Sequence, residues 1–214
     1  SSDKSVYESG PIMSALAGTM TPSQTAPTNA PTNIASRAYS DILRDMVDFC
    51  AWAQNDSGSS RGGWRYTANY GSSDNSASFW PVLGLKAAEA WNIFPPAALK
   101  TEMTNWLEYS QADNGSFGYE SSSDGTVSRT AFGYCQLRYA HESPYHSNIL
   151  MAVQFLGSNF TVTATNDMYG LHAMARAAGL AEPYTMLFGT NDWKAAFADR
   201  LLTDQYSDGR WLGN

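Results

Sequence analysis

The feature that most constrains the fold of this 214-residue chain is a pattern of glutamine, glycine and an aromatic residue at the ends of predicted helices. In the stretch "NWLEYSQADNGSFGYE", Gln111 follows Leu107 by four residues and precedes Gly115 and Phe117. Three other stretches repeat the pattern: "FCAWAQNDSGSSRGGW", "ILMAVQFLGSNF" and "RLLTDQYSDGRW". Their residues are Gln54, Gly63 and Trp64; Gln154, Gly157 and Phe160; and Gln205, Gly209 and Trp211.

The chemistry of these residues explains why they recur at helix ends. A glutamine in the last turn can donate to the carbonyl groups that a helix leaves unpaired, or bond the backbone of the next loop. Glycine permits the left-handed conformation that stops a helix, and the aromatic ring covers the end of the hairpin. Each repeat is therefore predicted to be an outer helix, a loop and an inner helix, a unit that cannot bury its apolar face alone.

Helical periodicity runs along most of the chain. The predicted helices are residues 6–20, 36–54, 76–91, 95–110, 126–140, 145–156, 166–180 and 191–205. Ser76 is the expected N-cap of the third helix, residues 21–36 form a Pro/Thr/Asn-rich loop, and residues 159–165 are the one β-like segment. We expect an all-α protein with a single domain over residues 1–214, which is either a small or incomplete fold or one part of a longer protein.

The predicted helices alternate in character. Odd-numbered ones are apolar nearly all round, whereas even-numbered ones are amphipathic. Because a helix that is apolar all round is buried, the alternation predicts an inner layer of helices wrapped by an outer layer. The predicted inner helices can be aligned on four equivalent apolar residues, Leu16, Leu85, Leu137 and Met174. The position seven residues earlier is then occupied by Ser9, Ser78, Thr130 and Asp167.

Charge and composition exclude some classes of partner. Charged residues make up 15% of the chain and the net charge is −7, and no lysine or arginine cluster is present to neutralise phosphates, so nucleic acid is not an expected partner. No apolar run is long enough to span a bilayer. The abundance of Ser, Thr and Asn beside few Lys residues favours a secreted or cell-surface protein.

The glutamine, glycine and aromatic pattern resembles the "QW" repeat of squalene and oxidosqualene cyclases. The stretch "GGWRYTANYGSSDNSASFWPVLGLKAAEAW" is similar to the prenyltransferase/squalene-oxidase repeat of bacterial proteins. The resemblance covers nearly the whole chain and implies an α/α toroid, with inner helices around an axis and outer helices around them. About four hairpins are present in this chain, fewer than the family usually has.

The motifs that carry the family's chemistry are missing. Squalene-type cyclases protonate an alkene with an Asp-x-Asp-Asp motif that this sequence lacks, so cyclase activity is not expected and Asp74 and Asp124 are only weak catalytic candidates. Prenyltransferase β subunits bind zinc through Asp, Cys and His, and Cys135 and His172 fall at equivalent places on successive inner helices. The family's Asp-x-Cys and Tyr-His patterns are absent, as is the Gly-Cys-Gly-Glu-Gln motif of thioester domains.

No cofactor is expected. Zinc needs three or four ligands, of which only the weak pair Cys135 and His172 is suggested. Turn chemistry explains the aspartates of Asp-Gly and Asp-Asn-Gly sequences without calcium. Cys50 and Cys135 lie in apolar helical patterns and are expected to be buried free thiols, with a disulfide as the alternative.

The candidate binding site is a set of aromatic and acidic residues near the N-termini of the inner helices, which would ring a concave face in a toroid. Such a surface suits an apolar, carbohydrate or peptide ligand, while several members could simply pack the core. The set is Trp64, Tyr66, Asp74, Trp80, Tyr119, Asp124, Tyr134, Tyr169 and His172.

Two other functions stay open. One is an enzyme on the same fold, of terpenoid type or a polysaccharide lyase or hydrolase, for which Arg65, Arg129 and Arg176 lie near acids and tyrosines. The other is a scaffold for protein interactions.

Overall fold

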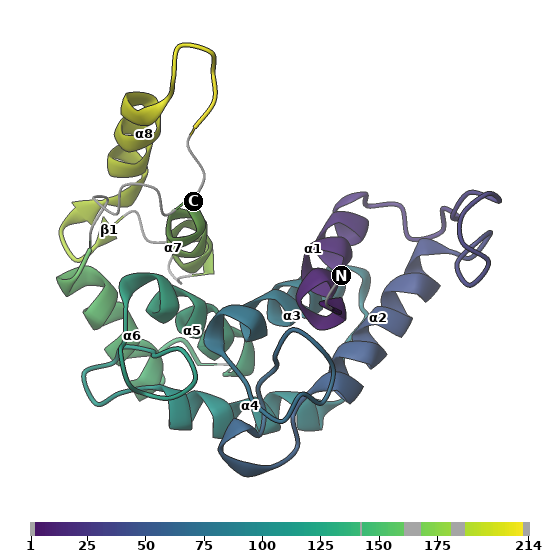
Figure 1. Cartoon of the computed structure of the whole chain (residues 1–214), viewed down its shortest axis with the longest axis horizontal. Coiled ribbons are helices and arrows are strands. Elements are labelled where there is room, and N and C mark those ends of the chain that lie inside the picture. Colours follow the sequence, from purple (N-terminus) through teal and green to yellow (C-terminus); the bar gives the residue numbers. More distant parts are fainter. Residues whose placement is uncertain (1–2, 142, 161–167, 181–186, 212–214) are drawn as a thin grey trace. The chain divides into compact units, whose positions relative to one another are not determined.

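The computed structural model is all-helical (Figure 1) and describes residues 3–141, 143–160, 168–180 and 187–211. Eight α-helices lie in these ranges: α1 Ser5–Gly18, α2 Tyr39–Ala53, α3 Asn75–Ala88, α4 Ala97–Ser110, α5 Val127–Ala140, α6 Ser147–Ser158, α7 Met168–Leu180 and α8 Trp193–Asp204. Short 3-10 helices cover Gly58–Ser60 and Glu89–Trp91. The expectation of an all-α chain with eight helices is thus confirmed.

Local details differ from the sequence expectations. The N-cap of α3 is Asp74 rather than Ser76, because the Asp74 carboxylate accepts a hydrogen bond from the Ala77 backbone nitrogen. Residues 21–36 form turns, with a bridge between Thr25 and Ala38. The β-like segment 159–165 lies mostly outside the described residues. A small antiparallel pair that was not predicted joins β1 (Leu187–Phe188) to β2 (Asn191–Asp192).

The chain divides into two compact units, residues 1–108 and 109–214, with the division inside the last turn of α4. In the first unit α1 packs on α3, and α2 lies against both. The close approach of α1 to α3 requires Gly10, because a Cβ there would lie 1.9 Å from the Trp80 carbonyl oxygen. The predicted single domain over residues 1–214 stays a prediction.

In the second unit α5 packs against α6 and α7. Phe117 is buried, and its ring occupies the space that a side chain at Gly133 of α5 would fill. In a separate aromatic cluster the Phe160 ring stacks on Phe188 and on Phe197 of α8, with ring centroids 6.2 Å and 5.8 Å apart. Within their own units, α3 and α5 bury residues on nearly every side, as expected for inner helices.

Three of the four predicted glutamine loops share one set of hydrogen bonds, which we call the glutamine stitch. In each, the glutamine directly follows a helix (α2, α4 or α8) and its Nε2 donates to the carbonyl oxygen of a glycine with positive φ. The bonds are Gln54 to Gly62 at 2.9 Å, Gln111 to Gly115 at 3.3 Å and Gln205 to Gly209 at 2.9 Å. The three glycines have φ values of 92°, 86° and 85°.

The backbone of each stitch is also the same. The residue after the glutamine exchanges two backbone hydrogen bonds with the glycine and its successor. These pairs are Asn55 with Gly62 and Gly63, Ala112 with Gly115 and Ser116, and Tyr206 with Gly209 and Arg210. The equivalent glycine of the first repeat is therefore Gly62 and not Gly63, so that Gly62-x-Trp64 matches Gly115-x-Phe117 and Gly209-x-Trp211.

The aromatic residue completes the stitch. Trp64 Nε1 donates to the Cys50 carbonyl oxygen at 2.8 Å, and Trp211 Nε1 donates to that of Leu201 at 2.7 Å. Both acceptors lie four residues before the glutamine. In the first two stitches the aromatic residue also bonds the helix that follows, α3 or α5. The backbone nitrogen of Trp64 donates to Ser78 Oγ, and that of Phe117 donates to Thr130 Oγ1.

Two stitches also hold the first turn of a helix further along the chain, α4 for the first stitch and α6 for the second. Gln54 Nε2 donates to the Leu99 carbonyl oxygen at 3.2 Å, and Gln111 Nε2 donates to that of Asn148 at 2.9 Å. Three residues further along, the Glu102 and Met151 carbonyl oxygens would lie 1.9 Å and 2.2 Å from a Cβ added at Gly62 and Gly115. The first stitch therefore contacts α4 at the same spacing of carbonyl groups as the second stitch contacts α6.

The fourth glutamine, Gln154, does not form a stitch. Its side chain is exposed and makes no hydrogen bond among the described residues. It lies inside α6 rather than after it, because the helix continues to Ser158.

Substitution of Gly115 and Gly209 by alanine separates the two roles of the stitch glycine. Both need positive φ, but only the Gly115 site has a backbone oxygen in the way. We expect Gly209→Ala to lower the free energy of unfolding by about 1–2 kcal/mol, and Gly115→Ala to cost roughly 1–3 kcal/mol more through steric overlap. Urea unfolding of both variants measures the difference, and equal losses would contradict the contact with α6.

Candidate functional site

The nine predicted site residues are divided between the two units. Four of them, Trp64, Tyr66, Asp74 and Trp80, belong to the first unit, and five, Tyr119, Asp124, Tyr134, Tyr169 and His172, belong to the second. Two are core residues, since Trp64 and Tyr134 have exposed fractions of 0% and 2%. The others fall into local clusters that are described by unit.

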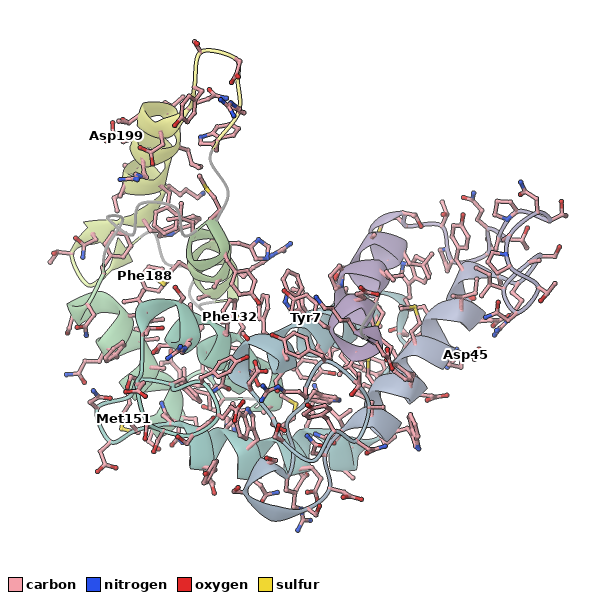
Figure 2. All side chains as sticks on the ribbon, viewed as in Figure 1. Tyr7, Asp45, Phe132, Met151, Phe188 and Asp199 are labelled. Carbon is pink, nitrogen blue, oxygen red and sulfur yellow. The ribbon has the colours of Figure 1, made fainter. Side chains whose placement is uncertain are left out.

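The first unit contains an aromatic cluster of Tyr7, Tyr66 and Trp80, all half-buried. The ring centroid of Tyr7, labelled on α1 in Figure 2, lies 5.5 Å from those of both Tyr66 and Trp80. Backbone hydrogen bonds place the first two rings, because the Tyr66 carbonyl oxygen accepts from the Val6 nitrogen at 3.0 Å. The close packing of Gly10 on the Trp80 backbone brings the third ring alongside.

An arginine joins this cluster to a buried acid. The Arg65 guanidinium lies 5.8 Å from the Tyr66 ring centroid and 5.9 Å from that of Tyr70, and its Nε is 3.2 Å from Asp74 Oδ2. Asp74 is fully buried, and its Oδ1 accepts from Ser76 Oγ and from the Ala77 nitrogen, both at 2.6 Å. The acid therefore caps α3 and holds Arg65 beside the rings.

Sequence reasoning missed Tyr7 and Tyr70. Tyr7 lies near the start of an inner helix, so the criterion that selected the other aromatics would have selected it too. Tyr70 precedes Gly71 in a polar loop and is 62% exposed. Its place beside Arg65 depends on the fold of that loop and has no signal in the sequence.

The second unit holds smaller groupings of the remaining candidates. The Arg129 guanidinium lies 5.4 Å from the Tyr119 ring centroid and donates to the Asp124 carbonyl oxygen at 2.6 Å. Asp124 itself is exposed and has a φ of 56°, so it serves as a left-handed turn residue. The Tyr169 ring packs on Phe132 with centroids 4.7 Å apart.

The suggested zinc ligands, Cys135 and His172, are poorly suited to bind a metal. Burial raises the pKa of the Cys135 thiol to about 12, and burial with the nearby Arg176 charge lowers the pKa of His172. In the described ranges no group of three His, Cys, Asp or Glu side chains could hold a metal ion. Cys50 and Cys135 are both free and buried.

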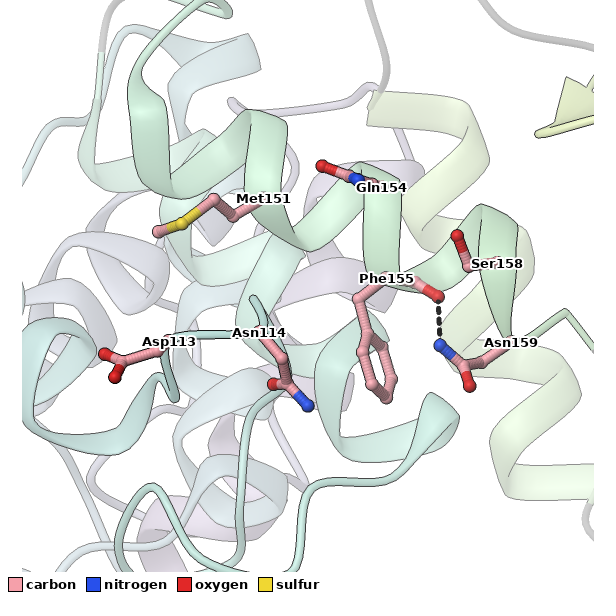
Figure 3. A pocket seen from close by; sticks show the side chains of 7 residues that line it. All are labelled: Asp113, Asn114, Met151, Gln154, Phe155, Ser158 and Asn159. Atoms are coloured by element: carbon pink, nitrogen blue, oxygen red, sulfur yellow. Dashed lines mark hydrogen bonds between the residues drawn. The ribbon is translucent and has the colours of Figure 1, made fainter.

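An open pocket of about 450 Å³ lies on the second unit (Figure 3). It is formed by the second glutamine loop and α6, and is lined by Asp113, Asn114, Met151, Gln154, Phe155, Ser158 and Asn159. The Asn159 side chain is held by a 2.9 Å bond to the Phe155 carbonyl oxygen. None of the nine predicted ligand-binding residues lines this pocket.

Comparison with known proteins adds no assignment, because no protein-family model and no curated protein matches the sequence. Among the described residues, no helix has the length and apolar character that a membrane crossing requires.

The cysteine environments predict unreactive thiols. Burial raises the pKa of Cys50 to about 11 and that of Cys135 to about 12, so both stay protonated near pH 8. We expect Ellman's reagent to modify neither thiol in the folded protein and two per chain in guanidinium chloride. Rapid modification of the folded protein would contradict their burial.

Two variants of Asp74 distinguish the stability that comes from capping α3 from the stability that comes from the ion pair with Arg65. Asp74→Asn keeps an oxygen that can accept from Ala77 but loses the ion pair with Arg65, whereas Asp74→Ala loses both. We expect both to lower the free energy of unfolding, and the alanine variant to be less stable than the asparagine variant by about 1 kcal/mol. Urea unfolding followed by tryptophan fluorescence tests this, and equal stability of the two variants would exclude a contribution from the cap.

Proposed function

We propose that this chain is a helical-repeat binding domain that takes a carbohydrate at the Tyr7–Tyr66–Trp80 cluster. The observation that carries the proposal is the contact of the half-buried Tyr7 ring with those of Tyr66 and Trp80, with Arg65 held beside Tyr66. Rings of this kind offer flat apolar faces for the C–H surface of a sugar, while the tyrosine hydroxyls and Arg65 offer polar groups for its hydroxyls.

The polarity of the cluster favours a sugar over a purely apolar ligand. Arg65 is 17% exposed and its charge is balanced by Asp74, so it stays beside the rings as a fixed donor. An isoprenoid offers no acceptor for that guanidinium, and burying it against such a ligand would carry a desolvation cost. A sugar hydroxyl can accept from it.

The contacts of Asp74 favour binding over cyclase-type chemistry. Alkene protonation needs a protonated acid, whereas a helix cap and an arginine partner both favour an ionised carboxylate. The proposal therefore assigns Asp74 a positioning task.

We further propose that the hairpins are arranged as an α/α toroid of about four units, on the outside of a cell or secreted. The support is the alternation of buried and amphipathic helices within each unit and the recurrence of the stitch at the ends of α2, α4 and α8. Abundant Ser, Thr and Asn with few Lys residues support the location.

The test is a thermal-shift screen against soluble β-glucan, chitin, xylan, mannan and α-glucan oligosaccharides. A ligand that binds only the folded protein stabilises it by about 2.7 kcal/mol at a concentration of 100 times Kd. We expect at least one oligosaccharide to raise Tm, and Tyr7→Ala and Trp80→Ala to abolish that rise. Isothermal titration calorimetry then gives the affinity.

The matched control is Trp52→Ala. Trp52 is an equally large ring, 65% exposed on α2, and pairs with Phe49 rather than with the cluster. This variant is expected to keep the full shift. Each variant is first checked for unchanged circular dichroism without ligand. A panel with no shift, or a shift that survives Trp80→Ala, would contradict the proposal.

A further inference from the structure

Tyr70 is an exposed aromatic residue on a loop whose backbone is held on both sides of it. Its two neighbours, Asn69 and Gly71, both have left-handed backbone, with φ values of 50° and 83°. The Asn69 nitrogen donates to the Ala53 carbonyl oxygen at 3.3 Å. The Gly71 nitrogen donates to Asn55 Oδ1, also at 3.3 Å. The loop is therefore fastened to the end of α2 immediately before and immediately after Tyr70.

The packing of Tyr70 itself does not explain why its loop is held in this way. The ring is 62% exposed, so its burial contributes little hydrophobic free energy. The side chain of Asn55 is 5% exposed and also donates to the Ser72 carbonyl oxygen at 2.8 Å, which adds a further bond to the same loop. Left-handed residues that the surrounding structure holds in place gather at binding and active sites. The loop thus presents a fixed aromatic face to solvent, as a ligand site would.

Tyr70 extends the Tyr7–Tyr66–Trp80 cluster through Arg65. The Arg65 guanidinium lies within cation–π distance of both neighbouring rings, 5.8 Å from the Tyr66 centroid and 5.9 Å from the Tyr70 centroid. The contacts therefore run in series from Trp80 through Tyr7, Tyr66 and Arg65 to Tyr70. Such a series is longer than one sugar ring needs.

We propose that this series of side chains takes a linear, uncharged oligosaccharide longer than a disaccharide, with Tyr70 stacking on a sugar unit beyond the Tyr7–Tyr66–Trp80 cluster. The inference rests on the carbohydrate-binding function proposed above and specifies its ligand. A sugar unit that stacks on Tyr70 buries apolar area of the ring. Because the loop already holds Tyr70 in place, little conformational entropy is lost when that unit binds.

The charges at the site favour an uncharged glycan over an acidic one. Asp74 Oδ2 lies 3.2 Å from Arg65 Nε, so the charge of the arginine is already balanced before a ligand arrives. The net charge of the chain is −7, which opposes the approach of a polyanion. A uronic acid polymer would therefore bind less tightly than a neutral chain of the same length.

Isothermal titration calorimetry with ligands of two lengths tests the proposal. The probes are cello-, chito-, xylo-, manno- and malto-oligosaccharides, each as the disaccharide and as the hexasaccharide. In at least one series we expect the hexasaccharide to bind about tenfold or more tightly than the disaccharide. Tyr70→Ala should remove most of this gain and leave the disaccharide affinity unchanged. Both proteins meet the same ligands, so the statistical advantage of a longer chain cancels from the comparison.

Two further variants serve as controls. Tyr70→Phe keeps the aromatic face and should keep the gain for the hexasaccharide. Tyr145→Ala removes a tyrosine that is 72% exposed and belongs to the second unit, and it should bind both lengths as the wild type does. The Tm of each variant without ligand is measured first, and the Tm of Tyr70→Ala should match that of the wild type.

The outcomes separate this inference from the function on which it rests. If the disaccharide binds as tightly as the hexasaccharide, or if the gain survives Tyr70→Ala, Tyr70 is not part of the site, while carbohydrate binding at the cluster stands. An oligogalacturonide that binds more tightly than every neutral hexasaccharide would overturn the assignment to an uncharged chain. Absence of binding in every series would contradict both proposals.

Discussion

The structure depends on the side-chain amide of the glutamine that directly follows α2, α4 or α8. Its Nε2 donates to the carbonyl of a left-handed glycine, which reverses the chain after the helix. In two repeats the same nitrogen also donates to the first turn of a further helix, α4 or α6. A single carboxamide thus joins three segments, and glycine is required because the helix backbone occupies the space of its side chain.

Two further backbone constraints bring together the candidate binding cluster on α1, on α3 and on the loop that contains Tyr66. Gly10 lets α1 approach the Trp80 backbone, and the Tyr66 carbonyl accepts from the first turn of α1. These contacts gather Tyr7, Tyr66 and Trp80, while buried Asp74 holds Arg65 beside them. Asp74, a weak catalytic candidate from the sequence, thus contributes to the site by orienting Arg65.

The bonds inside a glutamine stitch are distinct from the contacts that the stitch makes with a distant helix. The bonds of the stitch around Gln205, Gly209 and Trp211 lie within residues 201–211, so all of their donors and acceptors are close in the sequence. The contacts of the first two stitches with α4 and α6 instead join segments that are distant in the sequence.

The sequence by itself determined the helices and the recurring glutamine loops. Both are local, arising from apolar periodicity and from glutamine and glycine a few residues apart. It placed Gly63 and Gln154 wrongly in the pattern, because an insertion before Gly62 and the continuation of α6 past Gln154 shift the register. Only the tertiary structure showed that Trp64 and Tyr134 are core residues, that Tyr7 and Tyr70 join the cluster, and that Asp74 is a cap. The burial of Trp64 and Tyr134 and the contacts of Tyr7 depend on segments far apart in the sequence, which residue patterns within one helix do not record. The Asp74 cap and the place of Tyr70 beside Arg65 depend on the fold of the single loop before α3.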